Sequence, residues 1–128
     1  MIAAVDTLVD RYCAVWSEPD PDRRAELLAS VWARDATYVD PSVETQTPEE
    51  LLAHIAAVRK QRPGSRVVRT STVDCHHRVA RFLWMAVQAD GLVLRKGIDF
   101  AEFSQDGTRL QRVYGFVGPL DEESGEGS

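Results

Sequence analysis

Asp99 is the residue whose position points most directly to chemistry. It lies between Ile98 and Phe100 in a segment with the alternation of a strand, where aspartate is disfavoured. A buried carboxyl group must be paired or neutralised, and in an apolar cavity its pKa should rise, so that the neutral acid can donate a hydrogen bond. The alternative is a structural ion pair with Arg95, which the alternation places on the same face of the strand.

Asp40 and Tyr12 are the other two candidates for catalysis. Asp40 precedes Pro41 at the end of a short strand-like segment, and facing inward it could act as a base that removes a proton from carbon. Alternatively, Asp40 opens an ordinary turn and its side chain binds nearby backbone. Tyr12 lies on the apolar face of the first predicted helix, so its ring belongs to the core whether or not its hydroxyl faces a cavity.

The chain has three histidines, and imidazole can serve as an acid, a base or a metal ligand. His54 lies at the border of a helix's apolar stripe, as either a cavity acid or base or a paired core histidine. The adjacent His76 and His77 would point to opposite faces of an extended segment, and the sequence has no HxH, CxxC or HExxH spacing. It also has no GxSxG, P-loop or dinucleotide-binding glycine pattern. We therefore expect neither a bound metal nor a cofactor.

Large side chains could enclose the ligand if the helices do not fill the concave face of the sheet. Most of them are core residues, but any volume left over would be a dry cavity suited to a planar or polycyclic molecule. The predicted ligand is thus a small apolar organic compound. The residues predicted to shape its cavity are Trp16, Tyr38, His54, Trp84, Arg95 and Phe103.

Helices are predicted first along the chain and strands afterwards. Apolar spacings of three and four predict helices over residues 2–16, from Asp20 or Asp22 to Trp32, and from the N-cap Thr47 to residue 62. Period-two patterns predict strands over residues 36–39, 66–75, 79–89, 92–103 and 110–117, with hairpin turns at Asp90-Gly91 and Asp106-Gly107. This order is typical of an α+β fold with helices on one face of a curved, mainly antiparallel sheet.

The segment over residues 79–89 is apolar on both faces. Phe82, Trp84 and Ala86 alternate with Leu83, Met85 and Val87. Helices on one side of the sheet would leave the second apolar face exposed. A second copy of the chain is the simplest cover, so we expect a homodimer through the sheet.

Composition limits the class of protein. The 128 residues suit one domain, predicted over residues 1–120, followed by a disordered acidic tail over residues 121–128. Without that tail the formal charge of −5 falls to −1, and no basic face predicts a nucleic-acid partner. There is no basic leader and no apolar run of ~20 residues, so we expect a cytoplasmic protein without a membrane partner. Cys13 and Cys75 should be reduced, buried thiols.

Four segments resemble the nuclear transport factor 2-like superfamily, and within it the SnoaL-like polyketide cyclase and ketosteroid isomerase group. They are the helix around Tyr12, residues 35–41, residues 97–103 and residues 113–116. The resemblance covers residues 6–120 and implies a cone-shaped roll. It implies that Asp40 shuttles a proton while Tyr12 and Asp99 hydrogen-bond an enolate oxygen. Residues 52–55, the His76-His77 pair and Trp84 resemble SnoaL-like proteins of unassigned activity instead.

Three functions fit these observations. The first is a cofactor-independent proton transfer on a small apolar carbonyl compound: isomerisation, cyclisation or dehydration. The second is a non-catalytic ligand-binding or dimerisation module, with Asp99 paired to Arg95 and no space beside it. The third is an epoxide hydrolase, which would need Asp99, Arg95 and Asp40 around one water molecule.

Overall fold

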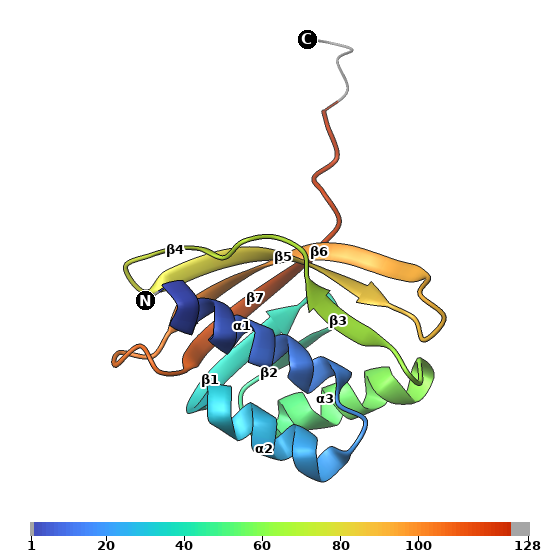
Figure 1. The fold of residues 1–128 in the computed structure, drawn as a ribbon, viewed down its shortest axis with the longest axis horizontal. Coiled ribbons are helices and arrows are strands. Elements are labelled where there is room, and N and C mark those ends of the chain that lie inside the picture. Colours follow the sequence, from blue (N-terminus) through green and yellow to red (C-terminus); the bar gives the residue numbers. More distant parts are fainter. Residues whose placement is uncertain (1, 124–128) are drawn as a thin grey trace.

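The computed structural model describes residues 2–123, which form three helices and one seven-stranded sheet. The helices lie against one face of the curved sheet, so the predicted α+β roll is confirmed (Figure 1). The helices are α1 (Ile2–Ser17), α2 (Pro21–Val31) and α3 (Pro48–Gln61). The strands are β1 (Trp32–Asp40), β2 (Val43–Thr45), β3 (Arg66–Arg69), β4 (Asp74–His76), β5 (Val79–Val87), β6 (Val93–Phe103) and β7 (Leu110–Val117).

The sheet is mixed but mostly antiparallel. Its strand order is β2-β1-β7-β6-β5-β3, and β4 pairs with β5 beyond the end of β3. Every neighbouring pair is antiparallel except β1 and β7, which run parallel. The parallel pair joins the strand that carries Asp40 to the hairpin that carries Asp99, so two segments about 60 residues apart face one cavity.

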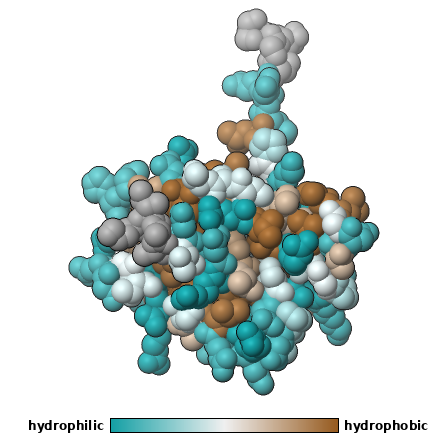
Figure 2. All heavy atoms as spheres, viewed as in Figure 1, coloured by the Kyte–Doolittle hydropathy of each residue, from teal (hydrophilic) through white to brown (hydrophobic). Residues whose placement is uncertain are grey.

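The core lies between the helical layer and the sheet. Its fully buried side chains come from α1, α2, α3 and the inner face of the sheet, among them Val9, Val15, Leu28, Val31, Leu51, Ile55, Leu110 and Val113. The buried Arg59 joins the end of α3 to α1, because its guanidinium donates to the carbonyl oxygens of Trp16 (2.9 Å) and Ser65 (2.7 Å). Figure 2 shows that charged and polar side chains cover much of the helical side.

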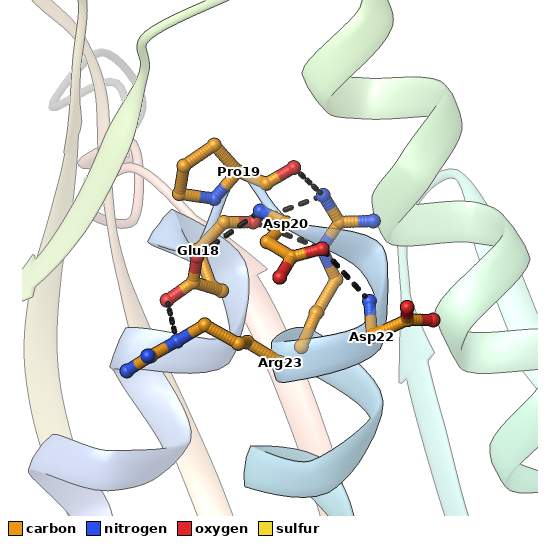
Figure 3. Close-up of polar contacts among 6 residues, drawn as sticks. Glu18, Pro19, Asp20, Asp22 and Arg23 are labelled. Atoms are coloured by element: carbon orange, nitrogen blue, oxygen red, sulfur yellow. Dashed lines mark hydrogen bonds and ion pairs between the residues drawn. The ribbon is translucent and has the colours of Figure 1, made fainter.

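A polar network fixes the connection between α1 and α2 (Figure 3). Asp20 caps α2 by accepting from the backbone N–H of Asp22 (3.2 Å), and Glu18 accepts from the backbone N–H of Asp20 (3.0 Å). The buried Arg24 donates to the carbonyl oxygens of Glu18 and Pro19. The turn holds the end of α1 that carries Trp16 against the rest of the fold.

Four predictions about local structure were wrong. Trp32 begins β1 rather than ending α2, and the short strand β2 was missed. The single strand predicted over residues 66–75 is split into β3 and β4, because the Ser71 hydroxyl accepts from the Leu83 N–H (2.8 Å) in place of a backbone carbonyl. Cys13 is buried as expected, but Cys75 is exposed on a short strand at the end of the sheet.

The chain leaves the body of the fold after β7 (Figure 1). Residues 121–123 of the predicted acidic tail are exposed and belong to no helix or strand, and residues 124–128 lie outside the described residues. Within residues 2–123, no helix is both long and apolar enough to cross a bilayer.

Candidate active site

A cavity of about 440 Å³ lies between α1, α3 and the inner face of the sheet. The structure brings Tyr12, Trp16, Tyr38, Asp40, His54, Trp84, Arg95 and Asp99 together in its wall. Phe103, the remaining predicted site residue, does not line it and is buried in the core instead. The rest of the wall consists of Cys13, Ser42, Ala57, Val58, Gln61, Arg62, Val67, Phe82, Ala86, Leu94, Gly115 and Val117.

Asp99 lies on the inner face of β6, between Phe82 of β5 and Gly115 of β7. It is only 6% exposed, and its Oδ1 accepts a hydrogen bond from Nε1 of Trp84 (2.8 Å). Burial raises the pKa of Asp99 to about 7; the bond from Trp84 opposes this rise, and the charge of Asp40 adds to it. No ion pair joins Asp99 to Arg95, so the structural ion-pair interpretation does not hold among the described residues.

Gly97 allows Trp84 to reach Asp99. Gly97 and Trp84 are direct cross-strand partners. A Cβ atom at position 97 would lie 2.3 Å from Cζ2 of Trp84 and 2.2 Å from the carbonyl oxygen of Phe116. Only glycine therefore leaves room for the indole ring to lie across β6 and point Nε1 at the carboxyl group.

Asp40 ends β1 and is held by hydrogen bonds to both oxygens. Its Oδ1 accepts from the N–H of Ser42 (2.7 Å), the hydroxyl of Ser42 (2.7 Å) and the N–H of Val43 (3.1 Å), as the turn interpretation expected. Its Oδ2 accepts from the hydroxyl of Tyr38 (2.6 Å) and lies 3.9 Å from Nε2 of His54. Burial alone would raise the pKa of Asp40, but these hydrogen bonds and His54 together lower it.

The Tyr12 hydroxyl is buried in the cavity wall, and its proton has no acceptor among residues 2–123. The Trp16 indole lies close enough to lower the Tyr12 pKa slightly, but it can act only as a donor. Its ring stacks on Trp32, with centroids 5.8 Å apart. Burial, then the charge of Asp99, raises the pKa of Tyr12, so the hydroxyl remains a proton donor. An unpaired buried hydroxyl costs about 1–3 kcal/mol, which a ligand oxygen at this position would recover.

Gly115 lies where the two carboxyl groups approach each other. A Cβ atom at position 115 would lie 3.1 Å from Oδ1 of Asp99, 3.3 Å from Cβ of Asp40 and 3.4 Å from the hydroxyl of Tyr38. The absence of a side chain keeps this space open. An isolated glycine inside a strand is a known sign of close approach, so Tyr114-Gly115-Phe116 held a signal that the sequence interpretation did not use.

Comparisons with known proteins give the family of the domain that carries this cavity. The sequence profile of the SnoaL-like domain matches residues 9–112, most of the chain. The chain belongs to the SnoaL-like family. A proposed isomerase of this family from Agrobacterium tumefaciens is 32% identical to it, with a TM-score of 0.84 over 91% of this chain and 99% of that one. No curated protein matches the chain.

More distant solved structures share the fold of this SnoaL-like domain. A proposed polyketide cyclase from Sinorhizobium meliloti is 16% identical, with a TM-score of 0.67 over 88% of this chain and 97% of that one. A proposed ketosteroid isomerase from Kribbella flavida is also 16% identical, with a TM-score of 0.65 over 96% of this chain and 84% of that one. The predicted family is confirmed by the profile match and the 32% identical structure, and these two structures show the same fold.

The SnoaL-like cavity combines apolar walls with few polar groups. The ring centroid of Trp16 lies 5.5 Å from that of Tyr38 and 5.9 Å from that of His54. These three rings form one cluster next to Asp40. Within residues 2–123, no group of three or more His, Cys, Asp or Glu side chains is placed to hold a metal ion. The chemistry that these groups can perform is proton transfer and hydrogen bonding.

Proposed function

We propose that this SnoaL-like protein is a cofactor-independent enzyme that moves a proton on a small apolar carbonyl compound. The observation that carries the proposal is that one cavity holds two carboxyl groups in opposite environments: Asp40 accepts four hydrogen bonds, whereas Asp99 is buried and accepts one. The pKa of Asp40 is lowered, whereas that of Asp99 is raised to about 7. Environments that separate the pKa values of two neighbouring acids typically assign one as base and the other as hydrogen-bond donor.

Asp40 takes the role of base through Oδ2. Three donors occupy Oδ1, whereas Oδ2 accepts a single hydrogen bond, from the Tyr38 hydroxyl, and so keeps a lone pair; His54 lies 3.9 Å away, beyond hydrogen-bond distance. Oδ2 accepts the proton from the carbon next to the carbonyl group, and the electrons of the broken C–H bond form an enolate. Return of the proton to another carbon completes an isomerisation. In a cyclisation the enolate carbon instead attacks a second carbonyl carbon, and the alkoxide that forms takes the proton back from Asp40. In a dehydration the enolate expels a hydroxyl group, which takes this proton and leaves as water.

Asp99 and Tyr12 stabilise the enolate oxygen. Protonated Asp99 has Oδ1 fixed by Trp84, which leaves its other oxygen to donate into the cavity. The Tyr12 hydroxyl is a second donor without a competing partner in the described chain. Donors that are already oriented in a dry site act on developing negative charge at little reorganisation cost. The likeness to a proposed isomerase at 32% identity supports the same class of reaction.

The test is the exchange of α-protons for deuterium in small cyclic ketones, followed by NMR in D2O. We expect the wild-type protein to accelerate exchange and Asp40→Asn to lose this activity by about a thousandfold while remaining folded, because the amide has no basic oxygen of comparable strength. Asp35→Asn is the matched control, since Asp35 lies on the same strand outside the cavity. An unchanged rate in Asp40→Asn excludes the mechanism.

The two alternatives lack the arrangement that each requires. A non-catalytic module was expected to pair Asp99 with Arg95 and leave no space, but a cavity lies beside Asp99. Epoxide hydrolysis would need Arg95 beside both carboxyl groups. Arg95 is four residues from Asp99 along β6, or about 13 Å at ~3.3 Å per residue. If the protein only binds ligands, a ketone will occupy the cavity without any acceleration of α-proton exchange.

The homodimer through the sheet belongs to the same proposal. Leu83, Ile98 and Phe116 are cross-strand neighbours on the outer face, and Leu83 and Phe116 are 47% and 55% exposed. Phe100 packs edge-on against Phe116 (5.8 Å between centroids). These residues would form the apolar centre of the interface. Charged residues around a hollow of about 360 Å³ on this face, among them Asp74, Arg81 and Glu102, would form its polar rim.

A further inference from the structure

The cavity carries opposite charges at its two ends. Among the described residues, Asp40 and Asp99 are the only acids in its wall, and they lie together around Gly115. Two arginines, Arg62 and Arg95, line the cavity as well. Both are exposed, so they lie where the cavity opens to solvent.

The register of the sheet places Arg95 far from the acids. The inner face of β6 presents Asp99, then Gly97 and then Arg95, opposite Phe82, Trp84 and Ala86 of β5. At ~3.3 Å per residue, the Cα atoms of Asp99 and Arg95 are about 13 Å apart. The indole of Trp84 therefore lies between the acid end and the arginine end.

Helix α3 places Arg62 at the same end as Arg95. His54 lies 3.9 Å from Asp40 and so marks the acid end of the helix. Arg62 caps the C-terminus of α3 eight residues later, about 12 Å along the axis at ~1.5 Å per residue. Two independent elements thus bring a guanidinium group to the mouth of the cavity.

Neither guanidinium group is used by the fold. Among residues 2–123, the side chains of Arg62 and Arg95 have no hydrogen bond and no ion pair, whereas Arg59, on the same helix, donates to two carbonyl oxygens. The nearby β5–β6 hairpin exposes the apolar Leu92 and Val93, and apolar surface is visible at this end of the sheet in Figure 2. Unpaired guanidinium groups beside apolar surface suit a molecule with an apolar body and an acidic group.

We propose that the substrate is an amphipathic organic anion, with its acidic group at Arg62 and Arg95 and its reacting carbonyl group at Asp99 and Tyr12. The apolar body lies against Trp84 and Val58 between the two ends. The position of the reacting carbonyl rests on the proposed function, whereas binding of the acidic group does not. A volume of about 440 Å³ admits a molecule of two or three fused rings.

Two fluorescent probes with the same aromatic skeleton test the proposal. 1-Anilinonaphthalene-8-sulfonate carries a negative charge, whereas N-phenyl-1-naphthylamine is neutral. We expect the wild-type protein to bind the sulfonate at least tenfold more tightly, and this preference to shrink as salt is added. The NMR signal of the Trp84 indole N–H should shift on binding, which places the probe in the cavity.

Variants assign the preference to the arginines. Arg62→Gln and Arg95→Gln should each weaken sulfonate binding about three- to tenfold and leave the neutral probe unchanged, because each removes one exposed charge contact. Arg95→Lys should retain most of the affinity. Arg78→Gln is the matched control, since Arg78 is exposed and does not line the cavity.

Equal affinity for the two probes would overturn the proposal, as would Arg62→Gln and Arg95→Gln variants that behave like the control. A Trp84 signal that does not move would also contradict it, because the probe would then bind elsewhere. Loss of α-proton exchange with the sulfonate preference intact would remove the proposed reaction and leave this ligand class standing.

Discussion

The Trp84 indole donates a hydrogen bond of 2.8 Å from Nε1 to Oδ1 of Asp99. This contact fixes one oxygen of a carboxyl group that is otherwise buried away from water. It also stabilises the ionised form, so the pKa of Asp99 is lower than burial alone would make it. Trp84 thus both orients the acid and holds its pKa near 7.

Removing this donor should shift the titration of Asp99. In Trp84→Phe the pKa of Asp99 should rise by about one unit, because a hydrogen bond to the charged form is lost. The upper limb of the pH profile of α-proton exchange should move with it. Trp16→Phe is the control, since Trp16 lines the cavity but makes no hydrogen bond to Asp99. A profile that stays in place in Trp84→Phe would contradict this role.

Asp99 should make the folded protein less stable as pH rises. Its folded pKa of about 7 lies above the value of ~3.9 for an unfolded aspartate. Between about pH 4 and pH 7 the folded protein holds a proton that the unfolded chain has released, so the free energy of unfolding falls with rising pH. The loss is complete above pH 7 and reaches about 4 kcal/mol at most. The lowered pKa of Asp40 acts in the opposite sense, but only below about pH 4.

Urea denaturation at pH 5 and pH 8 measures this effect. We expect a fall of about 2–3 kcal/mol in the wild-type protein and almost none in Asp99→Asn, which does not titrate. Asp35→Asn should behave like the wild type, because Asp35 is exposed and its pKa is lowered. The same pH dependence in Asp99→Asn and in the wild type would show that another group is responsible.

Replacement by alanine should have different effects at Gly97 and Gly115, the two glycines on the inner face of the sheet. At Gly97 the new Cβ would overlap the carbonyl oxygen of Phe116 and the indole of Trp84, so we expect a loss of about 2–3 kcal/mol in stability. At Gly115 the shortest contact is 3.1 Å, to Asp99, so the fold should survive while the exchange rate drops more than tenfold. Thermal unfolding and exchange rates separate the two cases. A Gly97→Ala variant as stable as the wild type would contradict the packing described here.

The proposed dimer depends on the outer face of the sheet. Phe116→Asp places a charge at the centre of the apolar patch and should give a monomer in sedimentation experiments. Leu120→Asp is the control, because Leu120 is exposed beyond the end of β7. A wild-type protein that sediments as a monomer at micromolar concentration would rule out this interface.

Local signals predicted most of the fold. The caps at Asp20 and Thr47 form as expected, and β7 has the predicted bounds. Thr47 accepts from the N–H of Glu50, and the Glu50 side chain accepts from the N–H of Gln46. The parallel pairing of β1 with β7 depends on contacts between distant segments, which no local pattern encodes.

The site was predicted only in part, because it too depends on contacts between segments that are distant in the sequence. Asp99 stood out because a carboxyl group inside an apolar strand is unusual. Phe103 was misplaced because alternation gives the face of the strand but not which part of that face remains uncovered. Arg62 was missed because it follows a helix end, where a cation is already explained by the helix dipole. The bonds of Asp40 to its turn were foreseen as one alternative, but its bond to Tyr38 was not, because a strand pattern does not give the orientation of a terminal side chain.

In the proposed mechanism, Asp40 is ionised and Asp99 is protonated at mildly acidic pH. A titration of the aspartate side-chain carboxyl carbons by ¹³C NMR, assigned with Asp40→Asn and Asp99→Asn, measures this directly. We expect the Asp99 signal to titrate near pH 7 and the Asp40 signal to titrate below the range of an ordinary aspartate. Titration of both signals together near pH 4 would contradict the proposed division of roles.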